Sequence, residues 1–347
     1  MADVRLGIIG FGGMGRGRAL NAAKLDGVRP TAVVDTREEA RQAAAEELDL
    51  AAFETLEEFI DADAADAVYI ATPNKFHAEQ TVRCLEAGIH VFCEKPMAMN
   101  AAEGEQMIEA ARQADHKLTI NLSYRATGPA RAARAVAEEG LLGEVYFART
   151  GWMRSRGIPG RGWFATKELS GGGPLIDLGV HRIDLALWLM GNPDPVAVSG
   201  ATYAALGKRL WAERGRDYQV EDLATGFVRF ANGATLSLEA SWATNSEWRE
   251  DMFTYVYGTK AGITHRSVGG TYDFEARMWG ETAGTYSETK LDPIGGPGHL
   301  EAFIEAIRED GPVPVPPEDA LAVQRIIDAL YESAETGREV RLDGEAD

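Results

Sequence analysis

A glycine pattern near the N-terminus constrains the fold of this chain more than any other feature. Gly10, Gly12 and Gly15 form a G-x-G-x-x-G sequence that follows the apolar run Val4–Ile9 and precedes a helix-like stretch. In a strand–turn–helix unit, the first glycine permits a tight turn, the second lets the backbone approach a pyrophosphate, and the third lets helix and strand pack closely. The sequence therefore predicts a βαβ unit that binds a dinucleotide, with the phosphates at the helix N-terminus.

An acidic residue further along the chain supports this interpretation and bears on the choice of cofactor. Asp35 ends the next apolar run, about 20 positions after Gly15, where a residue that binds the adenosine ribose is expected. A carboxylate there accepts hydrogen bonds from both ribose hydroxyls and repels the 2′-phosphate of NADP. Arg37 could soften that repulsion, but the sequence predicts NAD as the cofactor, with NADP less favoured.

Length and composition limit the class of protein. A chain of 347 residues predicts two domains, and no run approaches the ~20 apolar residues of a membrane span. The first strand begins almost at once, so we expect no signal peptide, and the only cysteines, Cys84 and Cys93, fit a reducing cytoplasm. The net charge of −19 argues against nucleic acid or anionic membrane as a partner. The six histidines form no metal-binding pattern.

The pattern of apolar residues changes after residue 122. Before it, strand-like and helix-like stretches alternate, which predicts a Rossmann domain with a doubly wound parallel sheet over residues 1–122. After it, successive strand-like segments predict an α+β domain with a largely antiparallel open sheet over residues 123–347. The expected strands are 6–9, 32–34, 67–71, 90–93, 118–120, 145–150, 196–202, 224–230, 234–243 and 252–257, and the expected helices are 37–48, 77–87, 101–114, 130–139, 175–190, 299–308 and 317–336.

Polar residues follow two of the expected parallel strands. Thr72 and His77 come after one strand, and Glu94 and Lys95 come after the next. Ligands of doubly wound sheets bind at the carboxyl ends of the strands, so we expect these residues near a nicotinamide. A lysine there can hold a substrate oxygen and move a proton if its pKa is lowered. The alternative is a solvated loop lysine.

A second pair of polar residues lies in the strongly apolar stretch 175–190. Asp177 and His181 are spaced i, i+4, which places them on one face of a helix. A carboxylate beside an imidazole raises its basicity and suits a general base, although a structural pair in the core has the same spacing. The preceding Gly171–Gly173 would allow close approach to a cofactor, or would form a flexible turn.

These motifs together resemble the glucose–fructose oxidoreductase / inositol dehydrogenase (Gfo/Idh/MocA) family over nearly the whole chain. The matching segments are 10–15, 71–77, 94–96, 124–125, 140–145, 171–181, 232–233 and 331–337. The resemblance implies nicotinamide-linked oxidation of a secondary alcohol of a sugar, sugar derivative or cyclitol, or the reverse reduction. It implies Lys95, Asp177 and His181 as the catalytic set, with Lys95 or His181 as the proton acceptor and Asp177 orienting the imidazole. It also implies a homodimer or homotetramer that forms through the open sheet face.

The motifs and the resemblance give two sets of expected binding residues. The cofactor set is Gly10, Phe11, Gly12, Gly13, Met14, Gly15, Asp35, Thr36, Arg37, Thr72, Pro73, Asn74, His77, Glu94, Lys95 and Asn121. The substrate set is Lys95, Asn121, Tyr124, Arg125, Arg154, Trp163, Asp177 and His181.

The segment before Asp177 carries aromatic and basic residues that suit a sugar. It contains Trp152, Arg154, Arg156, Arg161 and Trp163, which would equally suit a protein core and a solvated basic loop. Several arginines would be consistent with an anionic substrate such as a uronate or a sugar phosphate.

Two other functions share the motifs. One is an NAD-dependent glycosidase, which oxidises the sugar, eliminates the aglycone and then reduces the sugar again. The other is a non-catalytic NAD-binding regulator, which should have lost the catalytic residues that this chain keeps.

Overall fold

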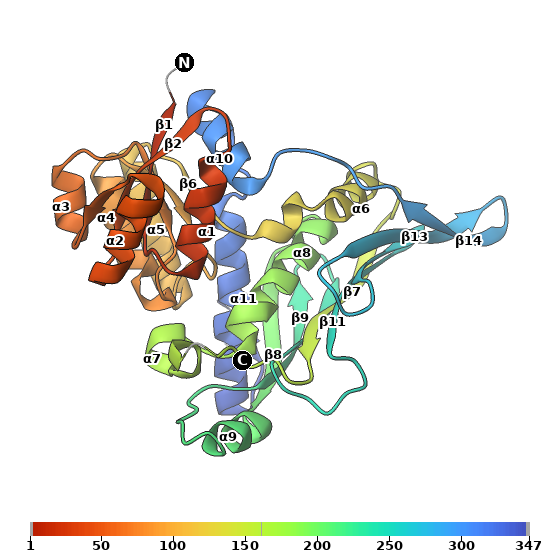
Figure 1. Ribbon diagram of the computed structural model, residues 1–347. Helices are drawn as coiled ribbons and strands as arrows, with labels where there is room; N and C mark the ends of the chain where they lie inside the picture. The colour runs from red at the N-terminus through yellow and green to blue at the C-terminus, as the bar shows by residue number, and fades with distance from the viewer. Residues whose placement is uncertain (1–2, 161, 345–347) are drawn as a thin grey trace. The chain divides into compact units, whose positions relative to one another are not determined.

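The computed structural model describes residues 3–160 and 162–344, and the chain forms two compact units (Figure 1). The first unit comprises residues 1–122 and 297–321, and the second comprises residues 123–296 and 322–347. Each unit has its own sheet, and the two are described separately below.

The first unit is built on a six-stranded parallel sheet with strand order β3-β2-β1-β4-β5-β6. Its central strands are continuous buried apolar runs, as is typical of parallel sheets covered on both faces. This confirms the expected doubly wound fold; the apolar pattern did not mark β3, a three-residue edge strand. The strands are β1 (Val4–Ile9), β2 (Val28–Val34), β3 (Ala51–Phe53), β4 (Ala67–Ile70), β5 (His90–Cys93) and β6 (Leu118–Ile120), and the helices between them are α1 (Gly13–Ala22), α2 (Glu38–Leu48), α3 (Leu56–Asp61), α4 (His77–Glu86) and α5 (Ala101–Ala114).

A helix from late in the sequence completes the first unit. The sequence-based division placed every residue after 122 in one domain, but residues 297–321 belong to the first unit. The reason is the apolar face of α10 (His299–Arg308): Phe303 is fully buried and its ring centroid lies 5.4 Å from that of Phe92 on β5. The chain then continues into α11 (Pro317–Thr336), most of which belongs to the second unit.

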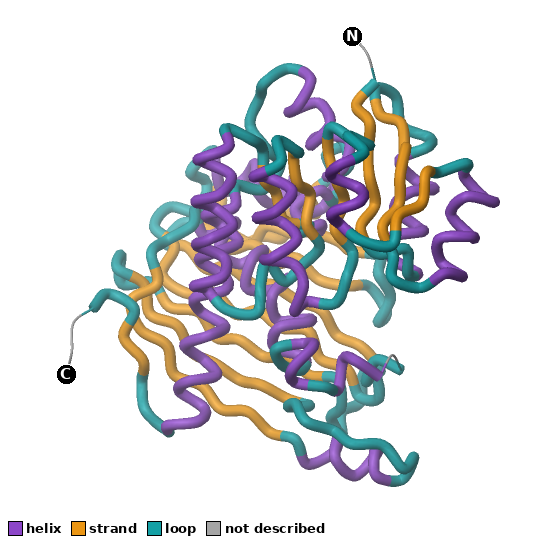
Figure 2. Tube along the Cα trace, turned by 90° about the vertical axis from the view of Figure 1, so that its left-hand side faces the viewer, coloured by secondary structure: helices purple, strands orange, loops and turns teal. Residues whose placement is uncertain are grey.

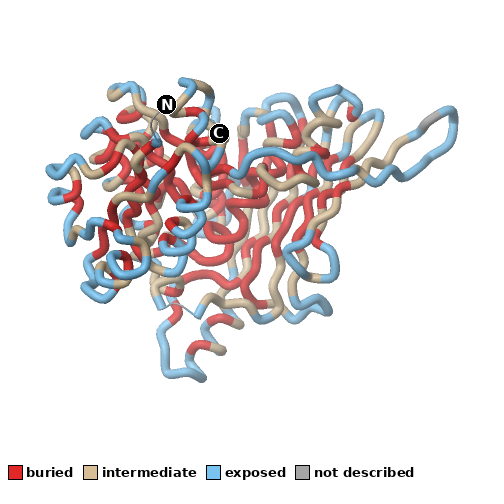
Figure 3. The backbone as a smooth tube through the Cα atoms, turned by 45° about the horizontal axis from the view of Figure 1, so that its top comes forward, coloured by how far each residue is buried: buried red, intermediate tan, exposed pale blue. Residues whose placement is uncertain are grey.

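The second unit is built on a nine-stranded sheet with strand order β14-β13-β12-β11-β7-β10-β9-β8-β15. Only β7 and β10 pair in parallel, so the sheet is largely antiparallel, as expected. Helices lie over one face of its strands (Figure 2), while the hairpin of β13 and β14 ends in exposed residues (Figure 3). The strands are β7 (Val145–Arg154), β8 (Pro195–Tyr203), β9 (Leu223–Phe230), β10 (Thr235–Ser241), β11 (Glu250–Gly258), β12 (Ala261–Ser267), β13 (Phe274–Thr282), β14 (Thr285–Leu291) and β15 (Val340–Arg341), and the helices are α6 (Gly128–Glu138), α7 (Lys167–Ser170), α8 (Val180–Met190), α9 (Ala205–Ala212) and α11.

Two further observations concern the described part of the chain only. None of its helices has the length and apolar character that crossing a membrane requires. Within the same residues, no group of three or more His, Cys, Asp and Glu side chains could hold a metal ion.

Candidate active site

The glycine turn after β1 has the geometry of a dinucleotide site. Gly10 has φ +89°, and a Cβ atom on Gly15 would lie 1.9 Å from the carbonyl oxygen of Gly10, so both positions need glycine for the fold itself. A Cβ atom on Gly12 would instead meet nothing within 4 Å. Helix α1 starts with Gly13 and Met14 and has no acidic residue in its first turn. Open space at Gly12 beside a helix N-terminus fits a pyrophosphate.

Asp35 lies at the end of β2 and is held as a carboxylate. It accepts hydrogen bonds from the backbone N–H of Phe11 (2.8 Å) and of Arg37 (2.9 Å), and the Arg37 guanidinium contacts both of its oxygens at 3.0–3.1 Å. Burial acts to raise the pKa of Asp35, but these hydrogen bonds and the charge of Arg37 outweigh it and lower the pKa. Thr36 between them is exposed. The expected ribose-binding carboxylate therefore faces the phosphate-binding turn.

The loop after β4 is tied to the loop after β5 by His77. One ring nitrogen of His77 lies 3.0 Å from the carbonyl oxygen of Thr72, and the other lies 2.8 Å from that of Pro96. The side chain is 1% exposed, and its burial lowers the pKa of His77 although both carbonyl contacts act to raise it. Pro73 and the buried Asn74 lie in the first of these loops. His77 thus fixes the backbone of both segments that were expected to approach the nicotinamide.

Glu94 sits in a buried network immediately before Lys95. It accepts a hydrogen bond from Asn121 Nδ2 (2.8 Å) and a short one from the Tyr69 hydroxyl, and Arg18 Nη2 lies 3.6 Å from the same oxygen. Asn121 is 3% exposed and also donates to Tyr69 (3.0 Å). Asn121 was expected to bind cofactor and substrate, and in the structure its side chain holds Glu94. The network therefore fixes the backbone next to Lys95.

The segment that carries Asp177 and His181 departs from a regular α-helix. Residues Leu175–Gly179 (η4) form one turn of π-helix, and α8 begins directly after it. The wider turn was not expected from the i, i+4 spacing, and such turns are frequent at functional sites. Both side chains are buried, with exposures of 9% and 8%.

Asp177 and His181 are surrounded by aromatic side chains of the same unit. The Trp242 indole N–H donates to Asp177 Oδ2 at 3.0 Å, and Trp242 itself is fully buried. The His181 ring lies edge-on to Tyr124 at 5.1 Å between centroids and tilted against Trp152 at 5.9 Å. The carboxylate and imidazole are thus oriented by packing and by one buried donor.

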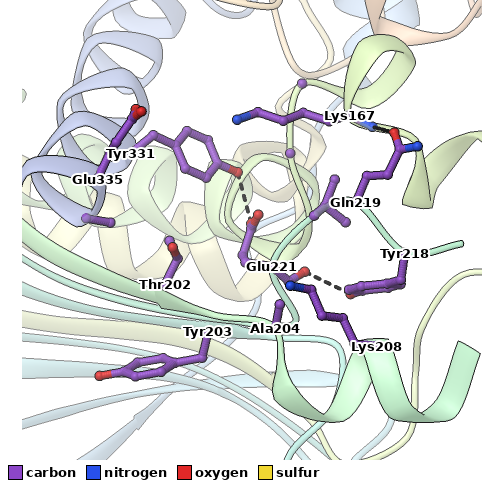
Figure 4. Close-up of a pocket in the computed structure, with 14 residues that line it drawn as sticks. Lys167, Thr202, Tyr203, Ala204, Lys208, Tyr218, Gln219, Glu221, Tyr331 and Glu335 are labelled. Carbon is purple, nitrogen blue, oxygen red and sulfur yellow. Dashed lines mark hydrogen bonds between the residues drawn. The ribbon is translucent and has the colours of Figure 1, made fainter. Parts of the chain in front are cut away.

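The start of this segment is clamped by Glu221 (Figure 4). Its carboxylate accepts the backbone N–H of Gly173 (2.9 Å) and of Leu175 (3.0 Å) and the hydroxyl of Tyr331 on α11 (2.9 Å). A Cβ atom on Gly172 would lie 2.0 Å from the Tyr331 hydroxyl, so the glycines pack tightly against their own unit. Burial raises the pKa of Glu221. A cavity of about 370 Å³ adjoins the clamp and is lined in part by Lys167, Lys208, Tyr218, Gln219 and Glu335.

Two arginines of this cluster are buried. Arg125, expected to contact substrate, pairs with Asp184 on α8, and the two side chains are 4% and 1% exposed. Arg182 is fully buried, and its guanidinium carbon lies 4.3 Å from the centroid of the Tyr124 ring. Arg125 therefore anchors the residues around Tyr124 to α8.

Arg154 sits at the end of β7 with three polar neighbours. Its Nε donates to Glu250 at 2.7 Å and its Nη2 donates to the Tyr272 hydroxyl at 2.8 Å. Trp152 Nε1 donates to the same Glu250 oxygen at 2.6 Å. Burial opposes the charge of Arg154, but the hydrogen bond and charge of Glu250 outweigh it and raise the pKa, with a smaller contribution from Asp177.

The loop after β7 presents an aromatic pair. Trp163 stacks on Phe164 with 3.9 Å between ring centroids, and both are partly exposed. Arg156 is exposed and donates to the carbonyl oxygen of Thr244 at 2.7 Å. Arg161 lies outside the described residues.

The structure thus gathers the expected residues in two groups, one in each unit. The first contains the cofactor set and Lys95, and the second contains Asp177, His181, Tyr124 and Arg154. Sequence reasoning missed Trp242, Glu250, Glu221 and Tyr331, because each is brought to the site by sheet register or helix packing and belongs to no short motif. One signal could have drawn attention to these residues, namely a polar residue within a segment that is expected to be buried. Glu221, which is 7% exposed in the structure, is an example.

Comparison with known proteins gives consistent matches over most of the chain. Residues 4–122 match a family described as oxidoreductase with an NAD-binding Rossmann fold, and residues 130–264 match the GFO/IDH/MocA C-terminal domain. The chain is 34% identical to D-glucoside 3-dehydrogenase of Escherichia coli over 80% of its own length and 79% of that protein. It is 31% identical to D-xylose 1-dehydrogenase (NADP(+)) 2 of Haloferax volcanii, over 97% and 99% of the two chains. A levoglucosan dehydrogenase solved with NADH has a TM-score of 0.84, 25% identity and coverage of 98% and 99%.

Proposed function

Because this chain belongs to the GFO/IDH/MocA oxidoreductase family, we propose that it is a sugar dehydrogenase whose catalytic residues are Lys95, Asp177 and His181. It is an NAD(P)-dependent oxidoreductase, with NAD as the cofactor, that acts on a secondary alcohol or ketone of a sugar, sugar derivative or cyclitol. Two separate observations support the residue assignment: the Rossmann glycine turn of the first unit, and the π-turn of the second unit that presents Asp177 and His181.

We assign each of the three proposed catalytic residues a role in the reaction. NAD, when bound, supplies the hydride acceptor. His181 or Lys95 takes the proton of the substrate hydroxyl, and Lys95 also holds that oxygen. Asp177, itself held by the Trp242 indole, orients the imidazole and stabilises its positive charge after proton transfer.

The experiment that tests this function follows reduced-nicotinamide absorbance with NAD and a panel of aldoses, glycosides and cyclitols. Lys95→Ala and His181→Ala should each lower kcat by about a hundred- to ten-thousandfold, the usual contribution of a positioned acid or base, and His181→Ala should leave NADH affinity unchanged. Lys24 is an exposed lysine that lies shortly after the end of α1. Lys24→Ala is therefore the matched control and should retain wild-type kcat. Near-normal turnover in either active-site variant would refute the assignment.

We also propose that the chain forms a homodimer or homotetramer through the second sheet. Cross-strand register places Phe147 of β7 on the same face as Tyr255 and Tyr257 of β11, and Tyr257 is 39% exposed. The Phe147 and Tyr257 rings stack at 5.5 Å. Aromatic residues gathered on an exposed sheet face are typical of an interface. Light scattering should give a multiple of the 37.6 kDa chain, and Tyr257→Glu should lower that mass; a monomeric wild-type protein would contradict the proposal.

A further inference from the structure

The charge of Arg154 bears on which sugars this enzyme accepts. Arg154 is a partly exposed guanidinium close to the proposed catalytic residues: its carbon lies 5.0 Å from the centroid of the Trp152 ring, which in turn contacts His181. Asp177 contributes to its electrostatic surroundings. A free guanidinium here would bind a carboxylate or phosphate on the substrate in a bidentate manner.

Glu250 prevents Arg154 from acting as such a receptor. The two residues are direct cross-strand partners on β7 and β11, and their side chains are 17% and 16% exposed. The 2.7 Å ion pair is therefore largely shielded from water, and the Trp152 indole fixes the same carboxylate oxygen. The Tyr272 hydroxyl accepts from the other arm of the guanidinium and lies 3.4 Å from Glu250. A substrate anion would have to displace a buried carboxylate to reach Arg154, which is unfavourable.

The neighbouring cations offer no substitute. Arg125 is buried in its pair with Asp184, and Arg182 is fully buried against Tyr124. Asp177 adds a further carboxylate to the group, and the chain as a whole carries a net charge of −19. The described residues around His181 therefore present hydroxyl, carboxylate and aromatic groups, which suit the hydroxyls and apolar face of an uncharged sugar.

We propose that this enzyme is specific for uncharged sugars and that Glu250 is a specificity-determining residue, which excludes anionic sugars by occupying Arg154. The inference rests on the dehydrogenase function proposed above, and it is the alternative to the anionic substrate that the arginine-rich segment suggested from sequence.

The test uses the full-length enzyme with NAD and matched pairs of methyl glycosides and methyl glycosiduronates, which differ only in CH₂OH against COO⁻ at C6. In the wild-type enzyme, kcat/KM for the neutral member should exceed that of the uronate by about a hundredfold, because the uronate carboxylate would lose water without gaining a partner. Glu250→Gln should free Arg154 and shift this ratio toward the uronate by about tenfold or more. Glu250→Asp keeps the charge and should leave the ratio near that of the wild type.

Two controls identify the residue that acts. Adding Arg154→Met to Glu250→Gln should abolish the gain on the uronate. Glu239→Gln removes the partner of Arg149 in a diagonal ion pair between β10 and β7 of the same sheet (2.7 Å) and should leave the ratio unchanged.

The outcomes separate this inference from the proposed function. A wild-type preference for uronates, or an unchanged ratio in a folded Glu250→Gln enzyme, overturns the inference while the dehydrogenase function stands. If Glu250→Gln does not fold, competitive inhibition of the wild-type enzyme decides, because equal or tighter inhibition by free glucuronate than by glucose also overturns it. Absence of NAD reduction with every sugar, neutral or anionic, refutes the dehydrogenase function itself.

Discussion

The hydrogen bond from Tyr331 to Glu221 gives a direct test of how the segment that carries Asp177 and His181 is held. Tyr331→Phe keeps the ring against Gly172 but removes the donor 2.9 Å from a carboxylate that is 7% exposed. Glu221 then retains its bonds to the backbone N–H groups of Gly173 and Leu175. A hydrogen bond to a charged group contributes about 1.5–3 kcal/mol, so the free energy of unfolding should fall by about 2 kcal/mol.

Urea unfolding followed by tryptophan fluorescence measures this change, since the chain has seven tryptophans. Tyr286→Phe is the matched control: its side chain is 70% exposed on β14, and the free energy of unfolding should change by less than about 0.5 kcal/mol. An equal, small effect of the two substitutions would refute the reasoning that Glu221 depends on Tyr331.

The same substitution should also lower activity, because Glu221 fixes the turn that presents Asp177. We expect kcat to fall about tenfold, equivalent to about 1.4 kcal/mol of transition-state stabilisation, with unchanged affinity for NADH. In an Asp177→Asn background, Tyr331→Phe should have no further effect on kcat, since the residue through which it acts is already lost. Additive losses of kcat in the double variant would show that Tyr331 acts on kcat independently of Asp177.

Three other predictions follow from the geometry. Gly12→Ala should leave stability unchanged but weaken NADH binding by tenfold or more in a titration, whereas Gly17→Ala, also with nothing within 4 Å of a Cβ atom, should bind normally. Asp35→Ser should shift the ratio of kcat/KM values toward NADP, and an unchanged ratio would show that another group discriminates. Burial lowers the pKa of His265 to about 3, below its unfolded value near 6.5, so its contribution to stability is present above pH 6.5 and lost as the pH falls. Between pH 6.5 and 5 this loss is about 1.5 kcal/mol, and His265→Phe should make the dependence of unfolding free energy on pH shallower by that amount.

The first unit could be predicted closely because its signals are local. The glycine turn, the ribose carboxylate and the buried parallel strands each involve a few adjacent residues whose chemistry admits few alternatives. Sequence could not show that Asn121 and His77 hold loops in place, since their partners, Glu94 and Pro96, are known only from the fold.

In the second unit, the partners of charged residues could not be predicted from the sequence. The arginines near residue 154 led to the hypothesis of an anionic substrate because a sequence displays charges without their partners. Glu250 lies 96 positions from Arg154 in the chain and faces it only through the pairing of β7 with β11. The π-turn at Leu175–Gly179 was likewise hidden, because the apolar pattern of residues 175–190 is compatible with a regular helix.

The discontinuous make-up of the first unit affects how the protein can be synthesised and recombined. Its core takes Phe303 from a helix encoded almost 180 residues after β6, so the dinucleotide-binding unit remains incomplete on the ribosome until residues 297–321 have emerged. A gene fragment that ends at residue 122 would express a sheet whose Phe92 lacks its covering ring, and we expect it to aggregate. A relative's second unit can therefore replace that of this chain only if both segments of the first unit are kept. Insertion of a new second unit after residue 122 meets this condition, whereas simple end-to-end fusion does not.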